Sequence, residues 1–147
     1  MIQYKGCGLP NVFLRNGYTK VDSPYGEGVS IHDIPGLHKA IADHVVCASE
    51  TLSGAQFRFL RMELDLSQEA LGALIGRDQQ SIARWEKGRT KVDPAGDRIL
   101  RALYKGVEGG RLRAFLTRLQ NLEASPPAQK IVVSERKNAW SAKAAAA

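Results

Sequence analysis

The sequence predicts a mainly α-helical fold, in which a bundle of short helices is preceded by a small β-rich α+β unit. Two observations support this. Apolar residues recur at helical spacing through residues 52–122, whereas residues 1–32 hold short β-prone runs separated by Gly, Pro and Asn. The expected units are an N-terminal unit, the helical domain, an amphipathic helix and a flexible tail, at residues 1–48, 49–105, 106–124 and 125–147.

The N-terminal unit is expected to contain short strands and one helix. Asn16-Gly17 predicts a type I′ turn that joins a strand at residues 12–14 to another at residues 18–21. Leu37, Ile41 and Val45 lie four residues apart and predict a helix over residues 34–46. The remaining expected segments are strands at residues 2–5 and 29–31, and a loop at residues 25–28. A unit this small cannot build a large core alone, so we expect it to pack on the next domain or on a second copy.

The helical domain has a well-marked start. Ser53 and Gln56 have the spacing of a capping box, and Leu52 and Phe57 have that of a hydrophobic staple. These two patterns predict that the first helix begins directly after Ser53. Its apolar surface is expected from Phe57, Leu60, Met62 and Leu64.

Residues 66–91 are the most informative stretch of the chain, because their spacing predicts a helix, a tight turn and a second helix. Ser67 can N-cap the first of these helices, and Gly76 ends it where a left-handed backbone is needed. Gly72 lies on the apolar side, where a larger residue would hold a second helix away. The apolar stripe at i, i+3 and i+4 is formed by Leu71, Leu74 and Ile75.

The second helix of this pair follows Asp78, which is its expected N-cap. Ile82 and Trp85 lie three residues apart and are expected to face the core. The residues left on the outer face are Gln79, Gln80, Ala83 and Arg84. A solvated face usually carries Glu/Lys pairs, whereas Gln suits the edge of adenine and Arg that of guanine. The pattern therefore predicts a helix-turn-helix that reads DNA, and the alternative is a helical hairpin with a polar surface.

The C-terminal third is expected to hold two more helices. Asp93-Pro94 predicts the start of the bundle's last helix, with apolar Ile99, Leu100, Leu103 and Tyr104, and Gly106 ends it. An amphipathic stripe follows at Leu112, Phe115, Leu116, Leu119 and Leu122. Periodicity alone does not distinguish a dimer surface from packing on the same subunit. After Ser125-Pro126-Pro127, residues 131–133 are a candidate strand, and from Ser134 onward the tail is expected to be loose.

Residues 52–104 resemble the Xre (Cro/C1) type of helix-turn-helix found in lambdoid phage repressors. The segments that carry the resemblance are Gln79-Gln80-Ser81-Ile82 and Glu86-Lys87-Gly88-Arg89-Thr90-Lys91. The resemblance implies a lambda-repressor-like bundle with an internal ion pair between Arg61 and Glu86. It also implies base contacts from Gln79, Gln80 and Arg84, and DNA backbone contacts from Ser67, Gln68, Ser81, Lys87, Arg89 and Lys91. The chain departs from the family at Arg77, where an apolar residue is usual.

The resemblance implies a homodimeric repressor of its own or a neighbouring operon, bound to an inverted repeat in double-stranded DNA. A symmetric dimer would place its recognition helices about 34 Å apart. A second family is similar in outline, the zinc-finger/helix-turn-helix antitoxins, because a small unit with Cys7-Gly8 precedes the motif. The cysteine pairs of that finger are missing. An antitoxin whose N-terminal unit binds a toxin is therefore the alternative, followed by a repressor that senses a small molecule.

Charge and composition agree with a polyanionic partner. The chain holds 21 Lys and Arg against 15 Asp and Glu, a formal net charge of +6. The excess lies in residues 51–105, with 10 basic and 7 acidic residues, and in residues 106–147, with 7 and 3. The sequence contains no apolar run near the ~20 residues of a membrane span and no signal-peptide pattern, so we expect a cytoplasmic, nucleoid-associated protein.

Metal binding and catalysis are not expected. The candidate ligands are Cys7, His32, His38, His44 and Cys47, but structural zinc requires four ligands in closely spaced pairs. The sequence contains no GxSxG, HExxH, P-loop or GxGxxG motif. Asp22, Glu27 and Asp33 lie beside glycine turns, where acidic residues are common for turn chemistry. The sequence therefore predicts no cofactor and no enzymatic activity.

Overall fold

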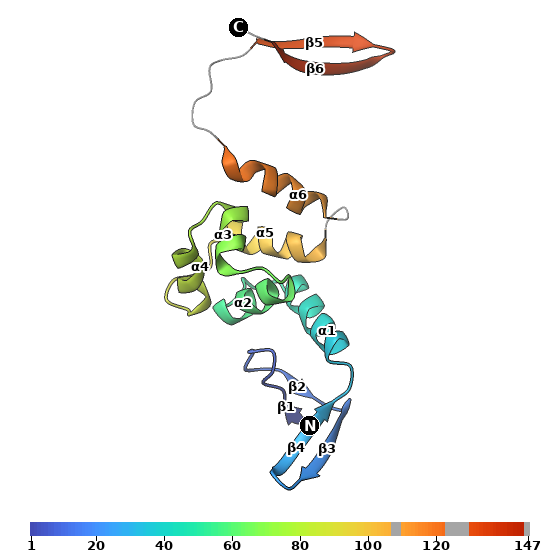
Figure 1. Cartoon of the computed structure of the whole chain (residues 1–147), viewed down its shortest axis with the longest axis vertical. Coiled ribbons are helices and arrows are strands. Elements are labelled where there is room, and N and C mark those ends of the chain that lie inside the picture. Colours follow the sequence, from blue (N-terminus) through green and yellow to red (C-terminus); the bar gives the residue numbers. More distant parts are fainter. Residues whose placement is uncertain (107–109, 123–129, 146–147) are drawn as a thin grey trace.

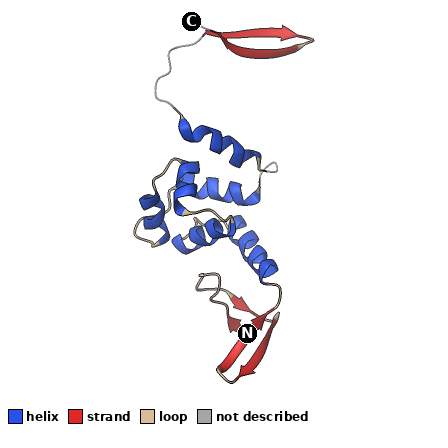
Figure 2. Ribbon diagram, viewed as in Figure 1, coloured by secondary structure: helices blue, strands red, loops and turns tan. Residues whose placement is uncertain are grey.

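The computed structural model describes residues 1–106, 110–122 and 130–145. A helical bundle lies at the centre, with β-hairpins toward both ends of the chain (Figure 1). Figure 2 shows the helices gathered in one block and the strands outside it. The mainly α-helical fold with a β-rich beginning, expected from the sequence, is confirmed.

The helices are short and follow one another closely along the chain. They are α1 (Ile34–Cys47), α2 (Gly54–Glu63), α3 (Gln68–Ile75), α4 (Gln79–Glu86), α5 (Pro94–Lys105) and α6 (Arg111–Arg118), with a 3₁₀ turn η1 (Leu119–Asn121). The strands are β1 (Ile2–Gln3), β2 (Phe13–Leu14), β3 (Tyr18–Ser23), β4 (Gly26–Ile31), β5 (Lys130–Arg136) and β6 (Ala139–Ala145). They pair in three antiparallel two-stranded sheets, β1 with β2, β3 with β4 and β5 with β6.

The turn expected at Asn16-Gly17 is wrong, because β2 and β3 on its two sides belong to different sheets. Strand β3 pairs with β4 instead, and their register closes at Ser23 opposite Gly26. The Ser23 hydroxyl stabilises this tighter turn, since it accepts from the backbone N–H of Tyr25 (3.2 Å) and donates to the Gly26 carbonyl (2.9 Å). The expected loop at residues 25–28 therefore lies largely within β4.

The hydrophobic core is continuous across the boundary expected at residue 48. Its largest fully buried side chains are Phe57, Leu60, Leu71, Ile82 and Leu100, from α2 to α5. The same cluster includes buried residues from α1 and from the segment before it, which are Ala42, Val45, Val46, Cys7 and Leu9. The N-terminal unit thus packs on the helical domain, which is one of the two arrangements that its small size predicts.

Arg101 of α5 fixes the segment that connects α1 to α2. Its guanidinium donates hydrogen bonds to the backbone carbonyls of Val46, Ala48 and Glu50. The buried Asp97 carboxylate accepts from Arg101 Nε (2.6 Å) and from the backbone N–H of Leu52 (2.7 Å). Because these polar groups satisfy one another, the connection is held as part of the bundle.

Helix α6 packs on α3 and α5 of its own chain. Leu112 and Leu116 lie against the core, whereas Phe115, Leu119 and Leu122 remain exposed, by 49%, 37% and 73%. The amphipathic stripe is therefore divided. One side is covered within the subunit and the other is open to a partner.

The C-terminal residues from 130 to 145 form a hairpin, which corrects the expectation of a loose chain after Ser134. Lys137 and Asn138 both have positive φ, 53° and 60°, the backbone of a type I′ turn. This two-residue turn joins β5 to β6 and sets their register. Residues 125–129 and 146–147 of the expected tail lie outside the described residues.

Candidate nucleic-acid interface

The backbone of the turn between α3 and α4 packs directly against Gly72 of α3. Gly76 has a φ of +77°, and the backbone N–H of Arg77 donates to the Gly72 carbonyl (2.8 Å). A Cβ built on Gly72 would overlap the Arg77 carbonyl oxygen. The glycine expected to let a second helix approach is thus in direct contact with the turn backbone.

Helix α4 begins with a side-chain cap. The Asp78 carboxylate accepts from the backbone N–H of Ser81 (2.7 Å), and the hydrogen bonds from Ser81 lower the pKa of Asp78 below 3.8. On the inner face of α4, Ile82 and Trp85 are buried as expected. The Trp85 ring meets Phe57 edge to face, with ring centroids 5.6 Å apart.

The opposite face of α4 presents hydrogen-bonding side chains to solvent. Gln79, Gln80 and Arg84 are exposed, and Ser81 is half-buried beside them. Arg84 makes one long hydrogen bond to the Ser81 hydroxyl (3.4 Å). Within the described part of the chain, the amides of Gln79 and Gln80 make no hydrogen bond that would occupy them. These groups are rigidly placed on a helix and available to an external partner.

Basic residues follow directly after this helix. Lys87, Arg89 and Lys91 are all exposed in the loop that joins α4 to α5. Among the described residues, none of the three takes part in an ion pair. The loop therefore adds unneutralised positive charge next to the exposed face of α4.

The structure contains the ion pair expected between Arg61 and Glu86. It is bidentate, with Arg61 Nε 2.7 Å from Glu86 Oε2 and Arg61 Nη2 2.9 Å from Oε1. The side chains are 11% and 3% exposed, and Arg61 Nη1 also donates to the Leu66 carbonyl (2.8 Å). The pair ties α2 to the last residue of α4, and so fixes the angle at which α4 leaves the bundle.

Three of the expected backbone-contact residues already have intramolecular partners, and one of them is Ser81, whose hydroxyl accepts from Arg84. The Ser67 hydroxyl caps α3 by accepting from the backbone N–H of Ala70 (3.0 Å). The Gln68 amide donates to Glu86 Oε1 (3.1 Å), so it joins the ion pair. Gln68 is half-buried and uses one of the two N–H bonds of its amide in this contact, so the second N–H can still donate to an external acceptor.

Arg77 belongs to a contact that periodicity did not reveal. Its guanidinium lies 5.8 Å from the centre of the Trp85 ring and donates to the Asp93 carboxylate (3.0 Å). The arginine therefore covers the indole from the position directly after the turn glycine. Asp93 precedes α5 without a side-chain cap bond, because its carboxylate is engaged with Arg77. The spacing of Trp85 and Arg77 along the chain gave no signal for this contact.

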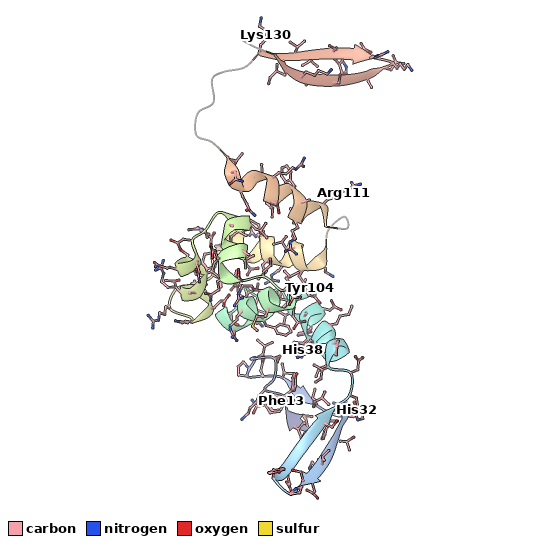
Figure 3. All side chains as sticks on the ribbon, in the orientation of Figure 1. Phe13, His32, His38, Tyr104, Arg111 and Lys130 are labelled. Atoms are coloured by element: carbon pink, nitrogen blue, oxygen red, sulfur yellow. The ribbon has the colours of Figure 1, made fainter. Side chains whose placement is uncertain are left out.

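The candidate metal ligands are spread over separate contacts. The His38 ring is hydrogen-bonded to the Tyr4 hydroxyl and to Glu63 (2.8 Å each), at the junction of α1 with the N-terminal strands (Figure 3). His32 contacts Thr19. In the described ranges, no group of three or more His, Cys, Asp or Glu residues is arranged to hold a metal ion. None of the described helices is long and apolar enough to cross a membrane.

Comparison with known proteins identifies one family. Residues 54–116 match the family described as a helix-turn-helix domain, a segment that runs from the start of α2 into α6 and covers less than half of the chain. No curated protein and no solved structure matches the chain. The chain thus contains a helix-turn-helix domain of the kind found in DNA-binding regulators, and α6 lies partly within it.

Proposed function

We propose that this protein is a sequence-specific DNA-binding transcriptional regulator that reads its operator with α4. The observation that carries the proposal is the outer face of α4, where Gln79, Gln80 and Arg84 are exposed opposite two buried anchors. In the major groove, the amide of Gln can both donate to and accept from the edge of adenine, and the guanidinium of Arg can donate two hydrogen bonds to guanine. A polar face held this rigidly has the properties needed for base readout.

Phosphate contacts would orient α4 in the groove. Arg89 and Lys91 in the loop after α4 are the main candidates, because both are exposed cations that follow the recognition helix directly in the chain. Ser67, Gln68, Ser81 and Lys87 are the secondary candidates. Contacts of this kind fix position and supply affinity without reading sequence, and they make binding strongly dependent on salt.

The regulator would act as a homodimer. One recognition helix reads few base pairs, whereas two copies about 34 Å apart read both halves of an inverted repeat. The exposed part of the α6 stripe, Phe115, Leu119 and Leu122, is one surface available to a second copy. Binding at a promoter would repress transcription by excluding polymerase from its own or a neighbouring operon.

The test is fluorescence anisotropy with the DNA upstream of the protein's own gene, against a scrambled duplex, over a salt series. We expect a preference of about 10³ or more for the operator, with steep salt dependence. Gln80→Ala should lose about 1–3 kcal/mol on the operator and relax the base preference. Gln120→Ala changes an exposed glutamine on η1, away from α4, and should bind as the wild type does.

A variant that removes one positive charge distinguishes contacts with DNA phosphates from contacts with bases. Lys91→Ala should weaken operator and scrambled DNA alike and flatten the salt slope by about 1. Lys20→Ala, an exposed lysine on β3, is the control and should leave both unchanged. Equal weak binding of wild-type protein to both duplexes, or full operator affinity in Gln80→Ala, would contradict the assignment of α4 as the recognition helix.

A groove in the N-terminal unit favours a second candidate function, that of an antitoxin whose main partner is a toxin protein. The groove lies between β2 and α1, with a volume of about 630 Å³. Its walls are mostly apolar, including Phe13, Leu37 and Ile41, and Glu50 also lines it. Ile41→Lys should abolish a complex with the product of an adjacent gene while operator binding persists. If Ile41→Lys binds that protein as the wild type does, the groove is not its docking site.

A further inference from the structure

The C-terminal hairpin β5–β6 stands apart from the bundle. Figure 1 shows it beyond α6, at the far end of the molecule from β3–β4. Every residue of β5 is exposed, and among residues 130–143, whose burial is described, none belongs to the hydrophobic core or to the partly buried residues around it. A single two-stranded hairpin is only marginally stable in water. Its stability therefore calls for a surface that covers it.

The two faces of this hairpin differ in chemistry. Directly paired residues lie on one face of an antiparallel sheet, and successive residues alternate. Ile131 and Val133 therefore share a face with Trp140 and Ala142, since Val133 pairs with Ala142 and Glu135 with Trp140. Their neighbours lie on the other face, which carries Lys130, Arg136 and Lys143 together with Val132, Ser134 and Ser141. One face is thus apolar with a single carboxylate at its turn end, and the other is basic.

Burial of the apolar face would stabilise the hairpin appreciably. Ile131, Val133 and Trp140 are 70%, 52% and 70% exposed. Removing apolar side chains from water is stabilising in proportion to the area that is buried, and these three leave more than half of their surface uncovered. Lys130, at the start of β5, points away from the hairpin into solvent (Figure 3). A partner that covered the apolar face would therefore stabilise the hairpin.

We propose that this face is an interface between two copies of the chain, in which the hairpins pack apolar face to apolar face. The inference rests on the proposed operator-binding function, because that function requires a second copy. A two-fold interface must be self-complementary. The apolar face, with only Glu135 at its turn end, meets this condition better than the basic faces, which would repel each other. Trp140 of each copy would pack against Ile131 and Val133 of the other.

The size of the apolar face sets the expected strength of this interface. Strands of seven residues are about 24 Å long, so one hairpin face is smaller than the ~800 Å² per partner of a standard interface. We therefore expect modest affinity without DNA, and a dimer that two adjacent half-sites strengthen. The basic faces would point outward on both sides of the packed pair. There they would remain solvated, or lie near DNA phosphates.

The test measures self-association of the full-length protein by sedimentation velocity over a concentration series without DNA. Val133→Glu places a charge on the apolar face, and Val132→Glu places the same charge on the basic face one residue away. Each valine is exposed in β5, so the two variants are closely matched. We expect Val133→Glu to weaken the dimer by on the order of tenfold or more, the equivalent of about 1.4 kcal/mol, and Val132→Glu to leave it intact.

Tryptophan fluorescence gives a second readout. The chain has two tryptophans, Trp85 in the core and Trp140 on the hairpin. The emission should shift to the blue as wild-type protein is concentrated, and this shift should vanish in Trp140→Phe. The melting temperature of the bundle should be the same in all these variants, because the hairpin lies outside its core.

Four results would overturn the inference. The first is a wild-type protein that stays monomeric at every concentration, and the second is equal dimerisation of the two valine variants. The third is a dimer that is lost in Phe115→Glu but kept in Val133→Glu. The fourth is a loss of DNA affinity in the hairpin variants while their self-association is unchanged. The third would assign dimerisation to α6, and the fourth would make the hairpin a DNA contact. Failure of the proposed function is distinguished from all of these, because it appears as absent operator preference in a protein whose self-association behaves as expected.

Discussion

The ion pair between Arg61 and Glu86 offers the sharpest test of how α4 is held. Glu86→Gln keeps the shape of the side chain but removes its charge. Arg61 would then keep its positive charge in a site where it is 11% exposed, and one acceptor of its bidentate contact would be lost. The new amide group would also face either Arg61 or the Gln68 amide, both of which are donors.

The size of the expected loss of stability in Glu86→Gln follows from the burial of the ion pair. Removing one partner of a buried ion pair costs about 3–5 kcal/mol, because the other charge is left without compensation. For a chain of this size each kcal/mol lowers the melting temperature by about 2–4 °C, so the expected decrease is about 6–20 °C. Glu86 ends α4, where a carboxylate opposes the helix dipole. The stabilisation thus depends on Arg61 and is not a property of the helix alone.

Thermal and urea unfolding followed by circular dichroism would measure this change. The control is Asp93→Asn, which removes the charge from the more exposed pair with Arg77, whose side chains are 48% and 29% exposed. Surface pairs contribute about 0.2–1 kcal/mol, so this variant should melt close to the wild type. The double variant Arg61→Met with Glu86→Leu should recover much of the loss, since apolar replacement of a buried pair is often neutral or stabilising.

A Glu86→Gln protein that melts within a degree of the wild type would refute this account of the ion pair. A double variant as unstable as the sum of the two single variants would refute it as well, because the residues would then act independently.

Three further changes test other contacts. Gly72→Ala should destabilise the protein although alanine favours helices by about 1 kcal/mol, because a Cβ there overlaps the Arg77 carbonyl; greater stability in urea would contradict this close contact. The hydrogen bonds from Ser81 lower the pKa of Asp78, so its stabilisation is present above about pH 4 and lost as the pH falls through the folded pKa. Asp78→Asn, which still caps a helix, should flatten that acid-side loss in melts from about pH 2 to 5, and an unchanged pH profile would exclude this role. Arg101→Met removes the donors to the connection between α1 and α2 and leaves the buried Asp97 carboxylate without its ion-pair partner. It should therefore cost about 3–5 kcal/mol in chemical unfolding, with faster amide exchange at residues 46–52.

The sequence by itself determined the elements whose signals are local. The capping box at Ser53, the N-caps at Ser67 and Asp78, and the left-handed glycine at Gly76 all form as their spacing predicts. Each of these signals acts within one helical turn, between residues that are neighbours in any helix. The same local periodicity separated the buried Ile82 and Trp85 from the exposed outer face of α4.

Only the tertiary structure decided which strands pair, and where the domains join. Asn16-Gly17 carries a hairpin signal, yet the strands on its two sides pair elsewhere, because Ser23 stabilises a competing turn. The contact of Arg77 with Trp85 and the Arg101 hydrogen bonds join segments brought together by the folded chain. Strand pairing and side-chain partners depend on packing between segments that are distant in sequence, and a short sequence window does not contain both segments. For that reason the chain's local pattern revealed the helix that faces solvent, and its fold alone revealed what holds that helix in place.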